Sequence, residues 1–102
     1  MQKCIKMKTH FNVDFLEDST ETLRAIAHPI RIAIIDLLYS NGRLTVTHIY
    51  KQLKIEQAIA SHHLRILKNK KVVIVKRDGK NSIYSLANND YHEIIKTLKK
   101  VI

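Results

Sequence analysis

A group of residues able to exchange hydrogen bonds lies at helical spacing between Gln57 and Lys68. At about 100° per residue, Ala60, Leu64 and Leu67 fall on one side of a helix. The other side collects small and polar residues: Ala58, Ser61, His62, Arg65 and Asn69. Small side chains allow close approach, and serine, histidine and arginine suit base edges and phosphates. The stretch predicts a helix that reads nucleic acid; by periodicity alone, it could be an ordinary surface helix.

The residues before this stretch predict a second, shorter helix joined tightly to it. Thr45 is a suitable N-cap, and an apolar side follows it: Val46, Ile49, Tyr50 and Leu53. Only three residues, 54–56, separate the two helices. This is the helix-turn-helix pattern, in which the second helix enters the major groove. Glu56 occupies the cap position of that helix, where its long side chain caps less well than serine.

The residues after the stretch predict a basic β-hairpin. Residues 72–76 are mostly β-branched, Arg77-Asp78-Gly79-Lys80 supplies a turn, and residues 83–86 return as the second strand. Seven basic residues and one acidic residue between Arg65 and Lys80 carry most of the net charge of +9. A hairpin in this position is a wing beside bound DNA. The alternative is solvated charge on a hairpin.

Composition fits one small domain with a polyanionic partner. The chain has 102 residues, of which 45% are hydrophobic. We expect a basic arm over 1–12 and a domain over 13–102. The positive charge favours nucleic acid, or less often an anionic membrane surface. Because there is no long apolar run and Cys4 is the only cysteine, we expect a soluble, cytoplasmic protein with no intramolecular disulfide.

The remaining segments predict three further helices, over about 14–26, 29–39 and 88–102. Pro29 suits the first turn of the second of these, and Ser40-Asn41-Gly42 ends it. The last helix carries an apolar stripe that we expect to pack on the first helix and on a second subunit. The expected dimer residues are Leu16, Tyr91, Ile94, Ile95, Leu98 and Ile102. A helix that only covers its own monomer is the alternative. The fold expected is mainly α with a small β-hairpin, a winged helix-turn-helix of about five helices.

Three motifs, spaced in this order, resemble the ArsR/SmtB family of bacterial winged-helix repressors. They are residues 23–31 (LRAIAHPIR), residues 60–67 (ASHHLRIL), and residues 77–80 (RDGK) with Tyr84 and Leu86. The resemblance implies a homodimer that binds a palindromic operator in double-stranded DNA. It also implies that five residues of the recognition helix face the groove: Gln57, Ala58, Ser61, His62 and Arg65. Lys68 at the basic end of that helix, with Arg77 and Lys80 on the wing, is expected to contact the duplex beside them.

Both metal sites known in that family look dismantled in this chain. Thr45 and Thr47 stand where metal-sensing members have a Cys-x-Cys pair, and hydroxyls are poor ligands for soft metals. Asn88, Asp90 and Val101 occupy the places of the second site, and valine cannot coordinate zinc. We therefore expect no metal and no cofactor, and the sequence identifies no inducer.

Six histidines leave one alternative open. His10, His48 and His92 could contribute to an unrecognised metal site, particularly across a dimer, although no two histidines have the i, i+4 spacing of a shared helical face. We interpret His63 as a partly buried packing residue and His28 as the start of a helix.

The sequence favours a DNA-binding transcriptional regulator, and more specifically a repressor, over an enzyme. It has no glycine-rich phosphate loop and no nucleophile paired with a base. The alternative is a winged-helix module that binds an acidic protein partner, and peripheral membrane attachment is a more distant one.

Overall fold

The computed structural model describes residues 8–102. Most of the expected basic arm, including Cys4, lies outside them. Within them the elements follow in the order α1 (Val13–Ile26), α2 (Pro29–Asn41), β1 (Leu44–Thr45), α3 (Val46–Leu53), α4 (Gln57–Asn69), β2 (Val73–Asp78), β3 (Asn81–Leu86) and α5 (Asp90–Val101). No helix in this part of the chain has the length and apolar content needed to cross a membrane.

Local capping explains where the first two helices begin and end. The side chain of Asn12 accepts a hydrogen bond from the N–H of Phe15 at 2.7 Å and starts α1. His28 is the N-cap of α2, as predicted, and Pro29 follows it in the first turn. Gly42, at φ +83°, ends α2 two residues later than expected. Its left-handed backbone is the conformation that glycine adopts without steric cost.

The predicted hairpin is part of a three-stranded antiparallel sheet in the order β1-β3-β2. Two-residue β1 pairs with β3, Leu44 opposite Tyr84, and this strand was not predicted. The hairpin turn is also shorter than expected, because Asp78 pairs with Asn81 at the end of β2. Only Gly79 and Lys80 form the turn, and Gly79 has the positive φ, +63°, that such a turn needs.

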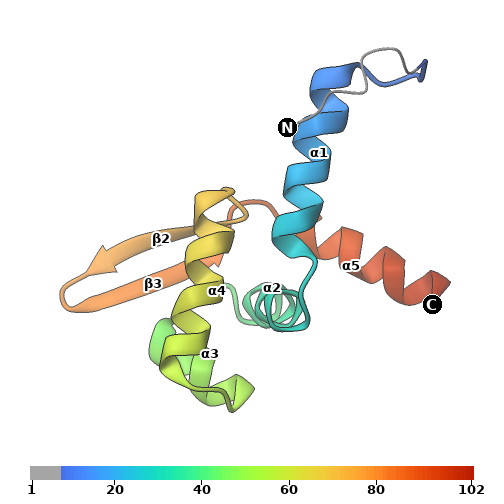
Figure 1. Ribbon diagram of the computed structural model, residues 1–102. Coiled ribbons are helices and arrows are strands. Elements are labelled where there is room, and N and C mark those ends of the chain that lie inside the picture. The colour runs from blue at the N-terminus through green and yellow to red at the C-terminus, as the bar shows by residue number, and fades with distance from the viewer. Residues whose placement is uncertain (1–7) are drawn as a thin grey trace.

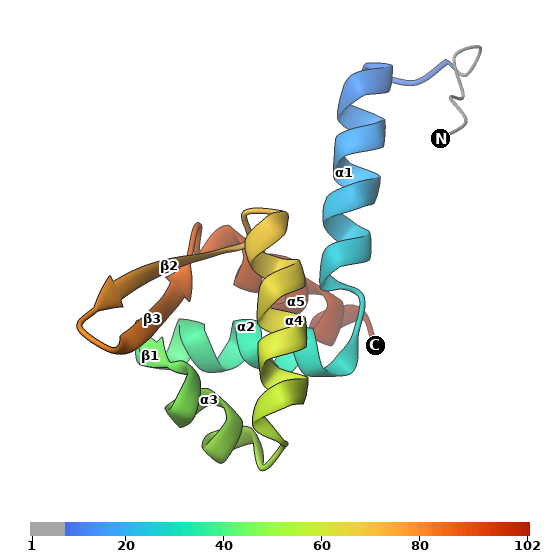
Figure 2. The same ribbon diagram turned by 60° about the vertical axis from the view of Figure 1, so that its left-hand side comes forward.

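The core forms where α2, α3, α4 and the hairpin meet. Its largest fully buried side chains are Ile34, Ile35, Leu38, Ile49, Leu64, Leu67, Val72 and Val73. Burying each of these contributes roughly 1.5–3 kcal/mol relative to leaving it exposed. Figures 1 and 2 show α2 inside the molecule, while the hairpin projects on one side and α1 extends away from the body on the other. The body therefore holds α4 firmly and leaves α1 largely uncovered.

Candidate nucleic-acid interface

The connection between α3 and α4 is a helix-turn-helix. The side chain of Thr45 caps α3 by accepting a hydrogen bond from the N–H of His48 at 3.2 Å. Beyond Leu53, where α3 ends, the N–H of Ile55 donates to the carbonyl of Tyr50 at 3.0 Å and closes the turn. The predicted cap and the predicted three-residue connection are confirmed.

The buried side of α4 fixes its orientation on the body. Ala60, Leu64 and Leu67 are fully buried, as their spacing predicted. Glu56 occupies the N-cap position, and its side chain makes no capping hydrogen bond. The first turn of α4 therefore keeps N–H groups that no side chain satisfies. Such groups at a helix start attract anions, including phosphate.

The opposite side of α4 presents the residues expected to read DNA. Ser61 is half-buried, and the others on this helix are exposed: Gln57, Ala58, His62, Arg65 and Lys68. Figure 2 shows α4 along the outside of the molecule beside the hairpin. The helix thus brings these side chains together on an open face; that they contact DNA stays a prediction.

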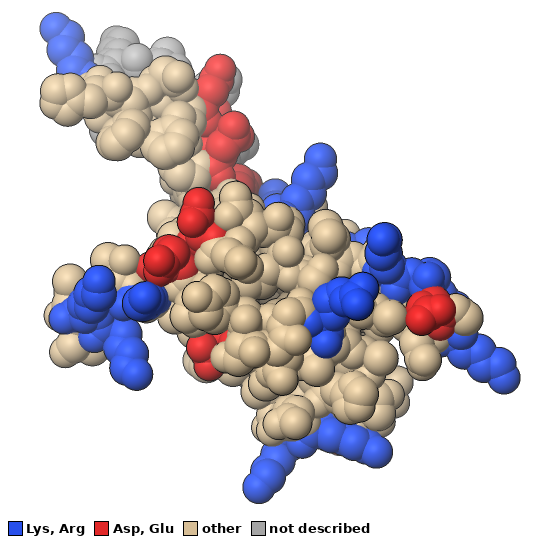
Figure 3. All heavy atoms as spheres, turned by 180° about the vertical axis from the view of Figure 1, so that it is seen from behind, with Lys and Arg blue, Asp and Glu red and all other residues tan. Residues whose placement is uncertain are grey.

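The hairpin adds exposed positive charge next to that face. Arg77 and Lys80 are both exposed, Arg77 near the end of β2 and Lys80 in the turn. Nη1 of Arg77 donates to Oγ of Ser82, the residue opposite it on β3, at 3.4 Å. Figure 3 shows Lys and Arg side chains around the hairpin and acidic side chains along α1. The hairpin is therefore a basic region and α1 an acidic one, while further lysines lie on α5.

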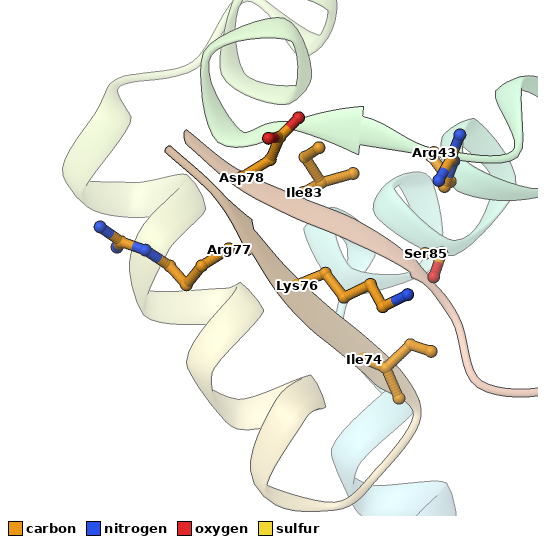
Figure 4. Close-up of a pocket in the computed structure, with 7 residues that line it drawn as sticks. All are labelled: Arg43, Ile74, Lys76, Arg77, Asp78, Ile83 and Ser85. Carbon is orange, nitrogen blue, oxygen red and sulfur yellow. The ribbon is translucent and has the colours of Figure 1, made fainter. Parts of the chain in front are cut away.

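The outer face of the sheet contains a shallow pocket of about 300 Å³. Ile74 and Ile83 contribute apolar surface to it, and Arg43 and Lys76 lie beside them (Figure 4). Sequence reasoning did not include Arg43, because it lies before α3 and joins the hairpin only through the pairing of β1 with β3. The sheet thus carries cations beyond those expected to contact DNA.

A polar link inside the molecule was not predicted. His63 is buried, with 7% of its surface exposed, and its Nδ1 accepts a hydrogen bond from Nε of Arg31 at 3.1 Å. Burial lowers the pKa of His63, and the neighbouring His28, Arg31 and His62 lower it further. His63 is thus a packing residue, as interpreted from the sequence, and also a hydrogen-bond acceptor.

The residues expected to form a dimer fall into two groups. Tyr91 and Ile95 pack against the core of their own chain, and Leu16 is half-buried on α1. Ile94, Leu98 and Ile102 are exposed. Exposed apolar residues that were not included in the expected set add to them: Phe11, Phe15, Leu23, Tyr39 and Val101.

Within one chain, α5 packs chiefly on α2, which corrects the expected pairing of the first and last helices. One edge of the apolar stripe of α5 covers the core of its own chain, and the other edge faces outward. The packing of α5 on its own chain is confirmed for one edge of the stripe, and a dimer contact by the other edge stays a prediction.

Two positions that the resemblance assigns to family metal sites, Thr45 and Val101, have another role or no ligand atom. Oγ1 of Thr45 caps α3 and also lies 3.1 Å from Nδ1 of His48. Val101 is exposed and apolar. Nε2 of His92 lies 2.9 Å from Oδ1 of Asp36, a pair that ties α5 to α2. Residues 8–102 contain no group of three or more His, Cys, Asp or Glu side chains placed to hold a metal ion.

Residues 28–75 match the protein family described as "Bacterial regulatory protein, arsR family". The transcriptional repressor PagR of Bacillus anthracis is 38% identical over 86 residues, which are 84% of this chain and 86% of that protein. The repressor SmtB of Mycobacterium tuberculosis is 37% identical over 82 residues, 80% of this chain and 60% of that protein.

Solved structures of similar proteins superpose on this chain. The crystal structure of PagR superposes with a TM-score of 0.76 over 85% of this chain and 99% of that one. A homodimeric winged helix-turn-helix DNA-binding domain from Mycobacterium bovis, 24% identical, gives a TM-score of 0.77 over 93% of this chain and 87% of that one, which shows the shared fold alone. The chain therefore belongs to the ArsR family of bacterial regulatory proteins and is a winged-helix transcriptional regulator rather than an enzyme.

Proposed function

We propose that this regulator binds an inverted-repeat operator in duplex DNA as a homodimer and represses transcription there. The observation that carries the proposal is the two-sided character of α4, which buries three apolar residues and exposes five of the six side chains expected to face DNA. Ser61, His62 and Arg65 would contact base edges, and Lys68 with the hairpin cations would contact phosphates. A regulator of this kind acts where the chromosome is, in the cytoplasm.

The exposed apolar residues of α1 and α5 support the homodimer. Phe15 and Leu23 on α1, and Ile94, Leu98 and Val101 on α5, would have to be covered by a partner to leave water. Both helices lie on the side of the molecule away from the hairpin tip (Figure 1). A twofold axis there would leave both α4 helices free and relate them by symmetry, so each would read one half of an inverted repeat. The homodimeric domain from Mycobacterium bovis is a precedent in the same fold.

We further propose that the operator is bound without either family metal site. The hydroxyl of Thr45 is committed to capping α3, and neither Thr45 nor Thr47 offers a thiolate. Val101 presents only carbon and hydrogen atoms in its side chain. DNA affinity is therefore expected to be the same with added zinc and with a chelator.

Selection of bound duplexes from a random pool, followed by a salt series on the best sequence, tests the proposal. The expected result is an inverted repeat whose log affinity falls linearly with log salt, by about 0.9 for each phosphate neutralised. Recovery of a site without twofold symmetry would contradict the homodimer. Recovery of no preferred sequence would contradict the regulator's proposed target and favour an acidic protein partner for the basic surface.

A further inference from the structure

Arg31 connects three helices through one side chain. From its place on α2, its Nε donates to Nδ1 of His63 on α4 at 3.1 Å. Its Nη1 donates to the carbonyls of Ala25 at 3.1 Å and Arg24 at 3.3 Å, which lie at the end of α1. The planar guanidinium holds its donors in a rigid fork, so these contacts fix the two helices relative to each other.

The link requires an uncharged imidazole. A guanidinium has donors only, so Nδ1 of His63 must be free of a proton to accept from it. The surrounding groups also disfavour a charge on His63: the ring of His28 lies 4.2 Å away and that of His62 5.0 Å away, centroid to centroid. From α1, the groups at this junction are the two backbone carbonyls bound by Arg31. Protonation of His63 would turn its Nδ1 from an acceptor into a donor facing another donor.

We propose that Arg31 is a positioning residue that holds the recognition helix α4 in its DNA-reading orientation relative to α1, through His63. The proposal rests on the proposed function, in which α4 reads bases and α1 contributes to the dimer. His62, one residue from His63, belongs to the expected reading face, so a shift of His63 moves a reading residue directly. Because both subunits repeat the link, it also sets how two α4 helices are placed across the dimer.

Such a role affects specific binding more than non-specific binding. Base contacts depend on the exact placement of a few side chains, whereas phosphate attraction depends on charge and tolerates small shifts. Loss of the link is therefore expected to reduce the ratio of specific to non-specific affinity. It is expected to leave the salt dependence unchanged, because Arg31 is partly buried and bound to protein atoms.

The test compares Arg31→Met with the control Arg24→Met. Arg24→Met removes the same charge at the same junction. The side chain of Arg24 is 70% exposed, and its Nη1 lies 3.9 Å from Oε2 of Glu21. Affinity is measured for the selected operator and for a random duplex of equal length, on protein shown to be folded by circular dichroism. Arg31→Met is expected to bind the operator about tenfold more weakly with random-duplex affinity and salt slope unchanged, and Arg24→Met to behave as wild type.

A second variant keeps the proposal testable if Arg31→Met fails to fold. His63→Asn places an amide oxygen near the position of Nδ1, where it can accept from Arg31 at any pH. The specificity ratio of the wild-type chain is expected to fall between pH 7.5 and pH 5.5, while that of His63→Asn stays constant. The comparison isolates His63, because the two proteins differ at that residue alone.

Four results would each overturn a separate part of the account. An unchanged specificity ratio in folded Arg31→Met would remove Arg31 from any positioning role. The same pH profile in wild type and His63→Asn would remove His63 from the proposed link. A salt slope reduced by about 0.9 in Arg31→Met would make Arg31 a phosphate contact instead. If the wild-type chain selects no operator, the proposed function itself fails and the role of Arg31 falls with it.

Discussion

The imidazole of His92 on α5 joins Asp36 and Tyr39 on α2. Its Nε2 lies 2.9 Å from Oδ1 of Asp36, and its ring stacks on that of Tyr39 with centroids 3.9 Å apart and planes 2° from parallel. Since α5 has no fully buried side chain, this contact and the half-buried Tyr91 and Ile95 hold the helix on the body. The orientation of the expected dimer surface depends on them.

Replacing His92 by alanine is therefore expected to destabilise the protein by about 1–2 kcal/mol, through loss of the stacked ring and the hydrogen bond. Asp36→Asn is the matched control: it keeps an acceptor oxygen, and because Asp36 is 64% exposed its charge contributes less than about 1 kcal/mol. Urea unfolding at one protein concentration measures both. Equal stability of His92→Ala and wild type would show that other contacts hold α5.

Two residues beyond the end of α4, a non-glycine residue adopts a left-handed conformation. Lys71 has φ +60°, while the N–H of Val72 donates to the carbonyl of Leu67 and that of Lys71 to the carbonyl of Lys68. This is the helix ending in which glycine is preferred. Lys71→Gly is expected to stabilise the fold by about 0.5–1 kcal/mol by relieving that strain. Lys70→Gly, at φ −95°, should give no such gain, and thermal unfolding compares the two.

Stability is also expected to depend on pH through His63. Burial, followed by the effect of His28, Arg31 and His62, places the pKa of this imidazole in the folded state below the unfolded value of 6.5. The unfolded chain therefore binds the proton more readily, and folding stability falls as pH decreases from about 6.5 through the folded pKa. Urea unfolding between pH 7.5 and pH 5 should show a larger loss for wild type than for His63→Asn. Equal losses would mean that the titration of His63 is not coupled to folding.

The outward edge of α5 provides a test of the dimer. Leu98 is 46% exposed and apolar, so Leu98→Asp would place a charge in an interface that covers it. Sedimentation is expected to give a dimer for wild type and a monomer for Leu98→Asp. Thr97→Asp introduces the same charge at the neighbouring exposed position and should leave a dimer. A wild-type monomer, or a dimeric Leu98→Asp, would contradict the interface.

Much of the fold could be predicted from the sequence because its signals are local. Ala60, Leu64 and Leu67 repeat at the spacing of one helical face, and all three are buried. Pro29 marks the first turn of a helix, and Asp78-Gly79 marks a hairpin. Each of these signals lies within one element, where periodicity or backbone preference is sufficient.

The features that could not be predicted depend on contacts between distant parts of the chain. β1 has only two residues and exists because Leu44 and Thr45 pair with β3 about forty residues later. Arg31 and His63 are 32 residues apart, and an arginine within an apolar helix gives no local sign that it will bind a buried imidazole. The extension of α1 away from the body likewise follows from packing rather than from its own sequence.

The central claim is that the exposed face of α4 reads DNA, and Arg65 on that face tests it most directly. The measurement is the affinity of Arg65→Ala for the selected operator and for the same operator with each base pair changed in turn. Lys96→Ala on α5 serves as a control of equal charge. We expect Arg65→Ala to lose about 1–3 kcal/mol and its preference at one position of each half-site, with the dimer intact and Lys96→Ala unchanged. Wild-type affinity and an unaltered base preference in Arg65→Ala would contradict the claim.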